Sequence, residues 1–412
     1  MRRFTTGIAI ACAMACSAFL IGAAQGTGQR RAPIVLLISL DGFRWDQVRR
    51  PGAVNLRALA ARGVRAERLV PAFPSKTYPN HYTLVTGLYP DHHGIVANSI
   101  WDSNLGKFAI GKDPAAHDGR WYGGEPIWVT AEKQHVRTAV YFWPGGDTEI
   151  EGVRATRSEV FEETVPRANR VRQILAWLAL PVDSAPRFVT LYFEDVDAEN
   201  HHGGPGSARA DSAIAHVDSA VGAVVAGIAK LGLTDVVNVI VVSDHGMAPI
   251  APERTVFIDD YVSMDSLDMI DWTPVSAIQP KPGREAYVYR KLKGANPHFA
   301  IYKKADVPAR FHFNTNPRIT PIVGIADEGW TVTTRKRDST FKWAENGGNH
   351  GFDNALSSMG ALFVAAGPAF RQGVVVPAFQ NIHVYPLMAE ILGLKPAKVD
   401  GSLDSVRVLL RR

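Results

Sequence analysis

P-I-V-L-L-I-S-L, residues 33–40, is a continuous apolar run that ends directly in Asp41 and Gly42. A run of this length and composition is typical of a β-strand that is buried on both faces. Such strands belong to parallel sheets that are covered by helices on either side. The segment therefore predicts an α/β fold, with Asp41 at the carboxyl end of a central strand.

The same layout occurs twice more along the chain. R-F-V-T-L-Y-F-E, residues 187–194, runs into Asp195-Val196-Asp197, and V-V-N-V-I-V-V-S, residues 236–243, runs into Asp244-His245. In open α/β sheets ligands bind outside the carboxyl ends of the strands. Three strands are thus predicted to bring acidic residues to one edge of the sheet, where a site would form.

Helical patterns separate these strands. Residues 169–178 and 208–231 both show helical spacing of apolar residues, and Gly232 provides a stop for the second. After about residue 361 the alternation resumes with a strand at 361–366 and a helix near 385–392. Alternating strands and helices predict three layers around a mostly parallel central sheet.

Residues from about 254 to 340 interrupt this alternation. They contain many prolines and short pieces that resemble strands, at 286–290, 298–303 and 330–334. We predict that they form a smaller inserted subdomain beside the site. Together with this insertion, residues 25–412 are predicted to form a single domain.

The overall composition supports a globular protein with an ordinary charge balance. The chain has 412 residues, of which 46% are hydrophobic and 21% are charged, so that general disorder is excluded. The formal net charge of +5 comes from scattered Lys and Arg, without a basic block interleaved with aromatic residues. Nucleic-acid binding is therefore not indicated, and a small-molecule partner is expected.

Residues 1–24 resemble an export signal. Arg2 and Arg3 precede an apolar run from 7 to 24 that ends in the small residues Gly22-Ala23-Ala24. We expect cleavage and a periplasmic or secreted protein without a transmembrane span. The alternatives are an uncleaved membrane anchor and lipid attachment at Cys12 or Cys16.

Both cysteines of the chain lie in this segment. A cleaved protein would contain no disulfide, thiolate nucleophile or cysteine metal ligand. Any metal must then be held by His, Asp and Glu, which suits zinc and other hard or borderline cations.

Five short clusters are rich in metal-ligand residue types. They are D-G-F-R (41–44), P-S-K-T-Y-P-N-H (74–81), D-A-E-N-H-H-G-G-P (197–205), S-D-H-G-M (243–247) and G-G-N-H-G-F-D-N (347–354). Taken alone, an Asp at a strand end is usually a turn or cap, and a His in a glycine-rich loop usually bonds to the backbone. Together the clusters supply a set of candidate ligands for two metal ions, Asp41, Asp197, His201, Asp244, His245 and His350. Two-metal sites stabilise the attacking and the leaving oxygen of a displacement at phosphorus.

Thr77 precedes a predicted helix in which Pro79 suits the first turn. A hydroxyl at a helix amino terminus lies close to backbone N–H groups that favour phosphoryl oxygens. A metal would lower its pKa and make it a nucleophile. The alternative is a plain helix N-cap.

These clusters resemble the nucleotide pyrophosphatase/phosphodiesterase family of the alkaline phosphatase superfamily, over nearly all of residues 33–410. F-P-S-K-T-Y-P-N-H-Y-T-L-V-T-G-L-Y-P-D-H-H-G-I-V-A-N, residues 73–98, is the most diagnostic segment. The resemblance implies an alkaline-phosphatase-like fold, two zinc ions and a covalent phosphothreonine at Thr77. It also implies a zinc held by Asp41, Thr77, Asp244 and His245, another held by Asp197, His201 and His350, and contact between Asn98 and a phosphoryl oxygen.

The chain departs from the family pattern in two places. Relatives usually have P-D-x-x-G-H where this chain has V-D-A-E-N-H at 196–201, which leaves His202 as a rival to His201. The four-residue step from Asp197 favours His201. Tyr78 occupies the position where many relatives have a phenylalanine that stacks on the nucleotide base, so an aromatic is retained. Three further aromatics are expected either to shape the pocket or to pack in the core, Trp121, Tyr122 and Trp143.

The resemblance implies a phosphodiesterase that cleaves nucleotide phosphodiester or pyrophosphate bonds and releases nucleoside monophosphates. One alternative keeps the fold and metals but acts on phosphocholine lipids, phosphomonoesters, phosphonates or sulfate esters. A monoesterase needs an extra cation near the phosphoryl group, and Arg44 is the only arginine within the clusters. A second alternative is a non-catalytic, secreted binding protein, which the complete set of ligands and the Thr77 hydroxyl oppose.

Overall fold

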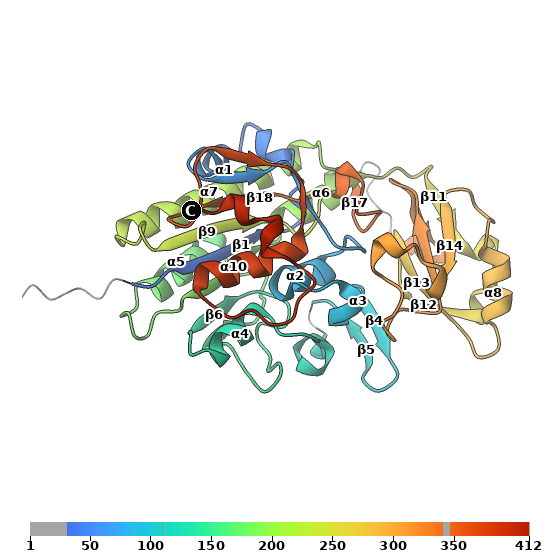
Figure 1. The fold of residues 1–412 in the computed structure, drawn as a ribbon. Coiled ribbons are helices and arrows are strands. Elements are labelled where there is room, and N and C mark those ends of the chain that lie inside the picture. Colours follow the sequence, from blue (N-terminus) through green and yellow to red (C-terminus); the bar gives the residue numbers. More distant parts are fainter. Residues whose placement is uncertain (1–30, 112, 341–346, 412) are drawn as a thin grey trace, which may run out of the picture. The chain divides into compact units, whose positions relative to one another are not determined.

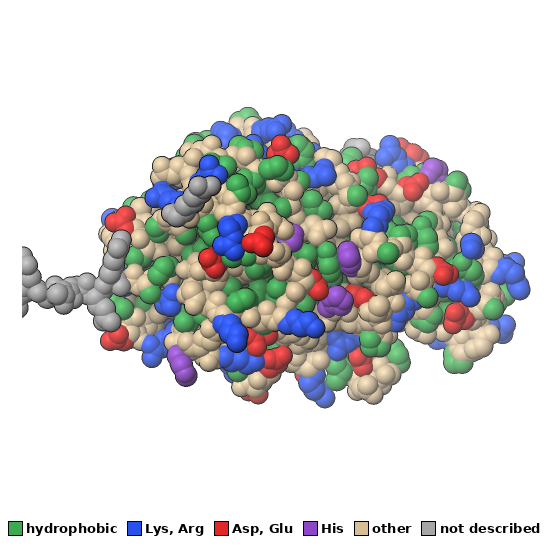
Figure 2. Space-filling view, in the orientation of Figure 1, with side chains coloured by type: hydrophobic (Ala, Val, Ile, Leu, Met, Phe, Trp, Pro, Cys, Tyr) green, Lys and Arg blue, Asp and Glu red, His purple; other side chains and the backbone are tan. Residues whose placement is uncertain are grey.

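The computed structural model describes residues 31–111, 113–340 and 347–411. Residues 32–412 form one compact unit. The predicted signal at 1–24 lies outside the described residues and stays a prediction. Over the face seen in Figure 2, basic side chains are scattered among acidic ones, in keeping with the dispersed charge of the sequence.

The centre of the fold is an eight-stranded sheet of order β19-β2-β18-β9-β1-β8-β6-β7 (Figure 1). β1 pairs in parallel with both β8 and β9, and among the eight strands β18 alone runs against the others. The strands predicted at 33–40, 187–194, 236–243 and 361–366 are confirmed. The strand bounds are β1 Ile34–Leu40, β2 Val64–Ala66, β6 Thr138–Tyr141, β7 Arg157–Glu159, β8 Phe188–Phe193, β9 Val237–Val242, β18 Phe363–Ala366 and β19 Val374–Val376.

Helices cover both faces of this sheet. Between the sheet and the helices lie two hydrophobic cores, and the side chains of β1 point alternately into one and the other. Val35 and Leu37 face one core, and Leu36 and Ile38 face the other. The first core is completed by α2 Thr77–Thr86, α4 Ile127–Lys133 and α10 Val384–Leu392; the second is completed by α1 Val54–Ala61, α5 Arg167–Leu178 and α7 Ala208–Lys230. The predicted three-layer α/β fold is confirmed, as are the helices at 169–178, 208–231 and 385–392.

α7 is long and apolar enough, by length and composition, to cross a membrane. Its apolar face is nevertheless buried against the sheet, with Ile214, Val217 and Val221 fully covered. Ser207 caps its start by accepting a hydrogen bond from the Ala210 N–H. We therefore interpret α7 as a core helix of this domain.

The predicted insertion contains a separate four-stranded sheet of order β12-β13-β15-β14 beside the central sheet (Figure 1). β11 and β16 pair in parallel where the chain enters and leaves it. The bounds are β11 Thr255–Phe257, β12 Leu267–Asp271, β13 Val275–Pro280, α8 Glu285–Leu292, β14 Phe299–Lys303, β15 Ile322–Ala326 and β16 Thr331–Thr333.

The strand predicted at 286–290 is wrong, because these residues lie in α8. The strand pattern arose from alternating Tyr and Val, yet Val288 and Leu292 are the buried positions, four residues apart as on one face of a helix. Glu285 in the first turn and Lys291 in the last also match the helix dipole. The strands predicted at 298–303 and 330–334 are confirmed as β14 and β16.

The remaining elements connect these parts. They are β3 Leu69–Val70 paired with β20 Phe379–Gln380, α3 Pro90–His93, the hairpin of β4 Ser99–Asp102 and β5 Gly106–Ala109, α6 Asp195–Gly203, β10 Ala248–Pro249 paired with β17 Gly348–Asn349, and α9 Arg335–Thr340.

His93 at the end of α3 is fully buried beside α2. Its Nδ1 accepts a hydrogen bond from the Ile95 N–H, so Nε2 carries the proton and donates to Thr83 Oγ1 at 3.0 Å. Burial lowers the pKa of His93 from 6.5 to about 3. The folded state therefore holds a neutral imidazole that the unfolded chain protonates below pH 6.5.

We expect this histidine to make the protein sensitive to mild acid. The pKa of His93 is lower in the folded state than in the unfolded state. The unfolding free energy that its neutral side chain contributes is therefore lost as the pH falls below 6.5. Between pH 6.5 and 4.5 the wild type should lose about 2 kcal/mol more unfolding free energy than His93→Gln. Urea denaturation at both pH values measures this, with the exposed His216→Gln as control. Equal losses in the wild type and His93→Gln would contradict the assignment.

Candidate metal centre

The carboxyl ends of β1, β8 and β9 deliver three carboxylates to one place, as the sequence predicts. Asp41 follows β1, Asp244 follows β9, and Asp197 lies in the first turn of α6 directly after β8. Asp41 and Asp244 are fully buried, and Gly42 packs closely against Asp197. Gly42 has a φ of +63°, and a Cβ there would lie 2.8 Å from the Cα of Asp197. Glycine at this position therefore permits the approach of β1 and α6.

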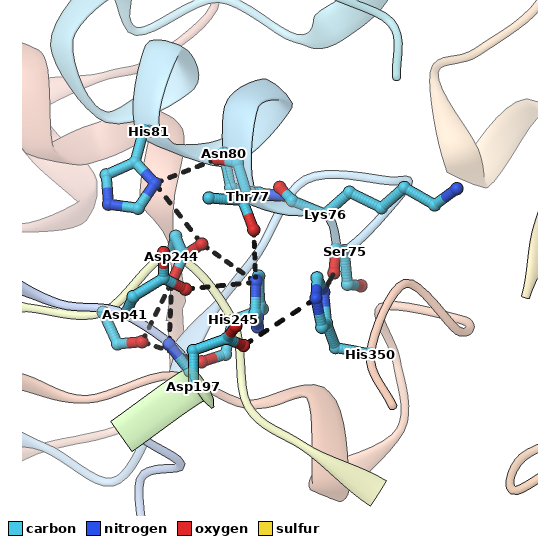
Figure 3. A network of polar contacts seen from close by, with 12 residues as sticks. Asp41, Ser75, Lys76, Thr77, Asn80, His81, Asp197, Asp244, His245 and His350 are labelled. Atoms are coloured by element: carbon cyan, nitrogen blue, oxygen red, sulfur yellow. Dashed lines mark hydrogen bonds and ion pairs between the residues drawn. The ribbon is translucent and has the colours of Figure 1, made fainter. Parts of the chain in front are cut away.

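A first group of side chains surrounds His245. Its Nε2 lies 2.9 Å from Asp244 Oδ2 and 3.5 Å from Asp41 Oδ1. Thr77 Oγ1 is 3.3 Å from the same nitrogen (Figure 3). The structure thus brings together Asp41, Thr77, Asp244 and His245, the set predicted to hold one metal ion.

A second group surrounds Asp197. His201 lies one helical turn later, with its Nε2 3.4 Å from Asp197 Oδ2, and the His350 Nε2 is 3.8 Å from Asp197 Oδ1. Ligand atoms of these three residues lie within 4.8 Å of one another. His202, the rival to His201, is exposed and its Nδ1 donates to the Ala198 carbonyl of its own helix. The geometry therefore favours His201.

The two groups form one continuous cluster. The rings of His245 and His350 stack with centroids 3.5 Å apart, and Asp41, Asp197 and His245 also lie within 4.8 Å of one another. Figure 3 shows these side chains converging from separate elements. Two cations placed here would therefore be close neighbours, as two-metal hydrolysis requires.

The three histidines are oriented in the same way. Each donates its Nδ1 proton to a backbone carbonyl, which fixes the tautomer and directs Nε2 into the cluster. The acceptors are the carbonyls of Gly348 for His201, Gly246 for His245 and Ser75 for His350. This arrangement is the usual one for histidines that bind metals.

The carboxylates of the cluster strongly perturb one another. Burial, together with the charges of Asp244 and Asp197, raises the pKa of Asp41 well above its usual range. Burial alone would also raise the pKa of Asp244, but the imidazoles of His245 and His81 hold it well below that range. Burial, His245 and His201 lower the pKa of His350, which keeps its imidazole neutral.

One buried oxygen of each carboxylate accepts no hydrogen bond among the described residues and has only the imidazole nitrogens of the cluster beside it, namely Asp41 Oδ1, Asp197 Oδ1 and Asp244 Oδ2. Buried charged oxygens without partners are costly, and a bound cation would satisfy all three. Imidazole and carboxylate ligands suit zinc and similar ions. The residues present therefore fit a metal centre.

Thr77 is the first residue of α2, and Lys76 occupies the N-cap position. The alternative of a plain N-cap is therefore not what the structure shows. Asn98 lies beside this helix start, where its Oδ1 accepts a hydrogen bond from the Tyr78 N–H at 3.1 Å. Tyr78 is partly buried against Phe108, and burial raises its pKa to about 12.

Trp121, Tyr122 and Trp143 are at most 4% exposed and belong to the core shared with α2. They pack in the interior, which is one of the two roles expected for them. Arg44 forms an ion pair with Asp46 and donates to the Met247 carbonyl, so it is held by the protein itself.

Two residues beside the cluster were not assigned a role from the sequence. His81, fully buried one turn after Thr77, donates its Nδ1 proton to the Thr77 carbonyl and accepts from Ser39 Oγ. Tyr192 donates its hydroxyl proton to Asp41 Oδ2 at 2.6 Å. The spacing of four from Thr77 was a signal for His81, whereas Tyr192 reads as an ordinary strand residue.

An α/β sheet with such a cluster at its carboxyl edge, beside a hydroxyl at a helix start, defines the class of metal-dependent hydrolases that act on phosphorus. Residues 35–353 match the family model described as type I phosphodiesterase / nucleotide pyrophosphatase. The chain belongs to this family, whose members hydrolyse phosphodiester and pyrophosphate bonds. The family, fold and enzyme class predicted from the sequence are thereby confirmed.

The chain is similar to several animal proteins. It is 40% identical over 386 residues to bis(5'-adenosyl)-triphosphatase enpp4 of Mus musculus, covering 92% of this chain and 82% of that protein. It is 36% identical over 403 residues to ectonucleotide pyrophosphatase/phosphodiesterase family member 1 of Rattus norvegicus, of which it spans 44%.

The structure is also similar to that of murine ectonucleotide pyrophosphatase/phosphodiesterase 5. An inactive Thr-to-Ala variant of that protein, solved in complex with AMP, superposes with a TM-score of 0.87 at 35% sequence identity. The match covers 92% of this chain and 100% of the other.

We expect Tyr192→Phe to weaken divalent metal binding by about 10–100-fold, because it removes the hydrogen bond that orients Asp41. Zinc titration against a competing chelator measures this. Tyr89→Phe is the matched control, since the Tyr89 hydroxyl donates to Gln380 instead. Unchanged zinc affinity in Tyr192→Phe would show that the contact does not orient a ligand.

Proposed function

We propose that the protein is a two-zinc phosphodiesterase that cleaves phosphodiester or pyrophosphate bonds of nucleotides and releases nucleoside monophosphates. The observation that carries the proposal is the position of Thr77 Oγ1. It lies at the amino end of α2, 3.3 Å from His245 Nε2, against a buried cluster with three carboxylate oxygens that accept no hydrogen bond among the described residues. This is the arrangement that attack on phosphorus by a hydroxyl requires.

The residues would divide between two ions as the family resemblance implies, Asp41, Thr77, Asp244 and His245 for one and Asp197, His201 and His350 for the other. Bound zinc supplies positive charge that lowers the pKa of a hydroxyl and neutralises phosphoryl oxygens. The histidines direct their Nε2 atoms into the cluster, and Tyr192 holds Asp41 in place.

Thr77 Oγ1 gives up its proton to solvent and attacks phosphorus, the bond from phosphorus to the leaving oxygen breaks as the bond to Thr77 forms, and the leaving oxygen takes up a proton from solvent. Water then attacks the phosphothreonine, which frees the nucleoside monophosphate and restores the hydroxyl. The amino end of α2 favours the negative phosphoryl oxygens. The Tyr78 N–H fixes Asn98 Oδ1, so that the Asn98 amide nitrogen is the donor for a phosphoryl oxygen.

A nucleotide is the substrate that the similar proteins support best. The murine relative was solved with AMP, and the murine protein named above is called a bis(5'-adenosyl)-triphosphatase. Tyr78 follows Thr77 directly and offers an aromatic ring for a base. The positive net charge of +5 also suits an anionic substrate.

Phosphomonoesters are a weaker candidate. A monoester carries one more negative charge, which needs a further cation near the phosphoryl group. Arg44 is held by Asp46 and the Met247 carbonyl, and is not available for this purpose. Phosphocholine lipids, phosphonates and sulfate esters share the reaction chemistry and belong in the same substrate comparison.

Thr77→Ala should lower kcat/KM by at least ~10³-fold on the nitrophenyl ester of a nucleoside monophosphate, because it removes the nucleophile. Steady-state kinetics and mass spectrometry of the trapped phosphothreonine measure this. Thr86→Ala is the matched control, since Thr86 lies in the same helix and donates to the Tyr82 carbonyl. Undiminished turnover by Thr77→Ala would refute the assignment.

A substrate panel on the zinc-loaded protein should show nucleotide diesters and pyrophosphates turned over at least ~100-fold faster than monoesters, because an unneutralised charge raises the barrier. Phosphocholine lipids and sulfate esters complete the panel. A preference for monoesters, or for lipids over nucleotides, would overturn the substrate assignment.

A further inference from the structure

Lys76, the residue before Thr77, is buried although it is a lysine. Its side chain is 5% exposed and extends away from the metal cluster (Figure 3). A lysine is almost never buried unless its charge is paired. The proposed chemistry gives no role to this residue, and its surroundings explain why it is there.

The ammonium group of Lys76 donates three hydrogen bonds to the turn between β12 and β13 of the insertion and to the strand ends that flank it. The acceptors are Asp271 Oδ2 at 2.7 Å, the Trp272 carbonyl at 3.0 Å and the Val275 carbonyl at 3.1 Å. All three donors of the group are therefore used. Because Nζ is saturated within the insertion, Lys76 cannot at the same time bind a phosphoryl oxygen.

The backbone carbonyl and the aliphatic stem of Lys76 contact α2 and the loop that carries His350. Its carbonyl accepts hydrogen bonds from the N–H and the Nδ2 of Asn80, within the first turn of α2. Its stem packs on Gly351, where a Cβ would lie 3.1 Å from the Lys76 Cγ. Gly351 follows His350, which donates to the Ser75 carbonyl. Lys76 thus joins the nucleophile helix, the His350 loop and the insertion.

Further contacts attach the insertion to the chain beyond α2. Asp91 of α3 accepts hydrogen bonds from Thr315 and Asn316, and Arg318 donates to Asp102 at 2.9 Å. Asp91 and Asp102 lie on either side of Asn98 along the chain. The Lys76 contact is made one residue before Thr77.

We propose that Lys76 is a positioning residue that holds Thr77 against the metal cluster by fixing the start of α2 to the β12–β13 turn. The insertion is then a working part of the active site. This inference rests on the proposed function in the role given to Thr77. A displacement of about 1 Å of a reacting group can cost about 100-fold in rate, so this contact has kinetic consequences.

Lys76→Met keeps the apolar stem and removes the charge, while Asp271, which is partly exposed, can be rehydrated. We expect kcat on the nitrophenyl ester to fall about 10–100-fold, with KM and zinc content nearly unchanged. Asp271→Asn should give a smaller loss, and the double variant should be no worse than Lys76→Met, because both act through one contact.

The matched control is Lys281→Met. Lys281 also pairs with an aspartate of β12, Asp268, at 2.7 Å, but this pair is about half exposed. An exposed ion pair of this kind contributes little to stability. We therefore expect the kcat of Lys281→Met to equal that of the wild type.

Hydrogen exchange tests the contact independently of activity. In Lys76→Met, peptides that contain 74–81 and 272–275 should both exchange faster, whereas in Lys281→Met both should exchange as in the wild type. Should Lys76→Met fail to fold, Asp271→Asn serves for both measurements. Unchanged exchange, or an unchanged kcat in an active protein, would overturn the inference. Faster exchange in a protein whose wild type does not hydrolyse the ester would support the contact and reject the proposed function.

Discussion

Three aspartates meet at the edge of the sheet, and the structure around them depends on this concentration of negative charge. The parallel pairing of β1 with β8 and β9 brings ligand atoms of Asp41 within 4.8 Å of Asp197 and of Asp244. Each has a buried oxygen without a hydrogen-bond partner among the described residues. Such an arrangement is unfavourable without a cation, so the same interactions that build the fold also build a metal site.

The neighbouring side chains offset this concentration of negative charge only in part. Tyr192 donates to Asp41, and His245 and His81 approach Asp244, yet burial and the other two charges still raise the pKa of Asp41. The remaining imidazoles are turned by backbone carbonyls so that their Nε2 atoms face the carboxylates. The protein's own hydrogen bonds therefore orient these ligand atoms toward one place.

The sequence predicted the parts of the fold that depend on burial. β1, β8 and β9 read as apolar runs because they are covered on both faces, and each ends in the residues that form the site. The helix α8 was mistaken for a strand because its Tyr and Val residues alternate locally, whereas its packing against β14 decided the outcome. The four-residue spacing of Val288 and Leu292 is the local trace of that packing.

The site residues that the sequence revealed lie in short motifs, whereas Tyr192 and Lys76, whose roles it did not reveal, act across long separations. Tyr192 meets Asp41 across 151 positions, and Lys76 meets Asp271 across 195. The residues next to Tyr192 and Asp271 in the chain do not indicate either contact. A motif therefore identifies the residues that would touch a metal or a substrate, while the residues that hold them in place become visible only in three dimensions.

The start of α2 shows why those supporting residues matter. A threonine at a helix start ordinarily uses its hydroxyl as a cap. Here the Asn80 amide nitrogen donates hydrogen bonds to the Pro74 and Lys76 carbonyls, and its Oδ1 accepts one from the Ala72 N–H. The Lys76 side chain is held by the insertion. Because other side chains hold the loop that leads into the helix, the Thr77 hydroxyl is free to face the cluster. Its reactivity therefore depends on contacts that it does not itself make.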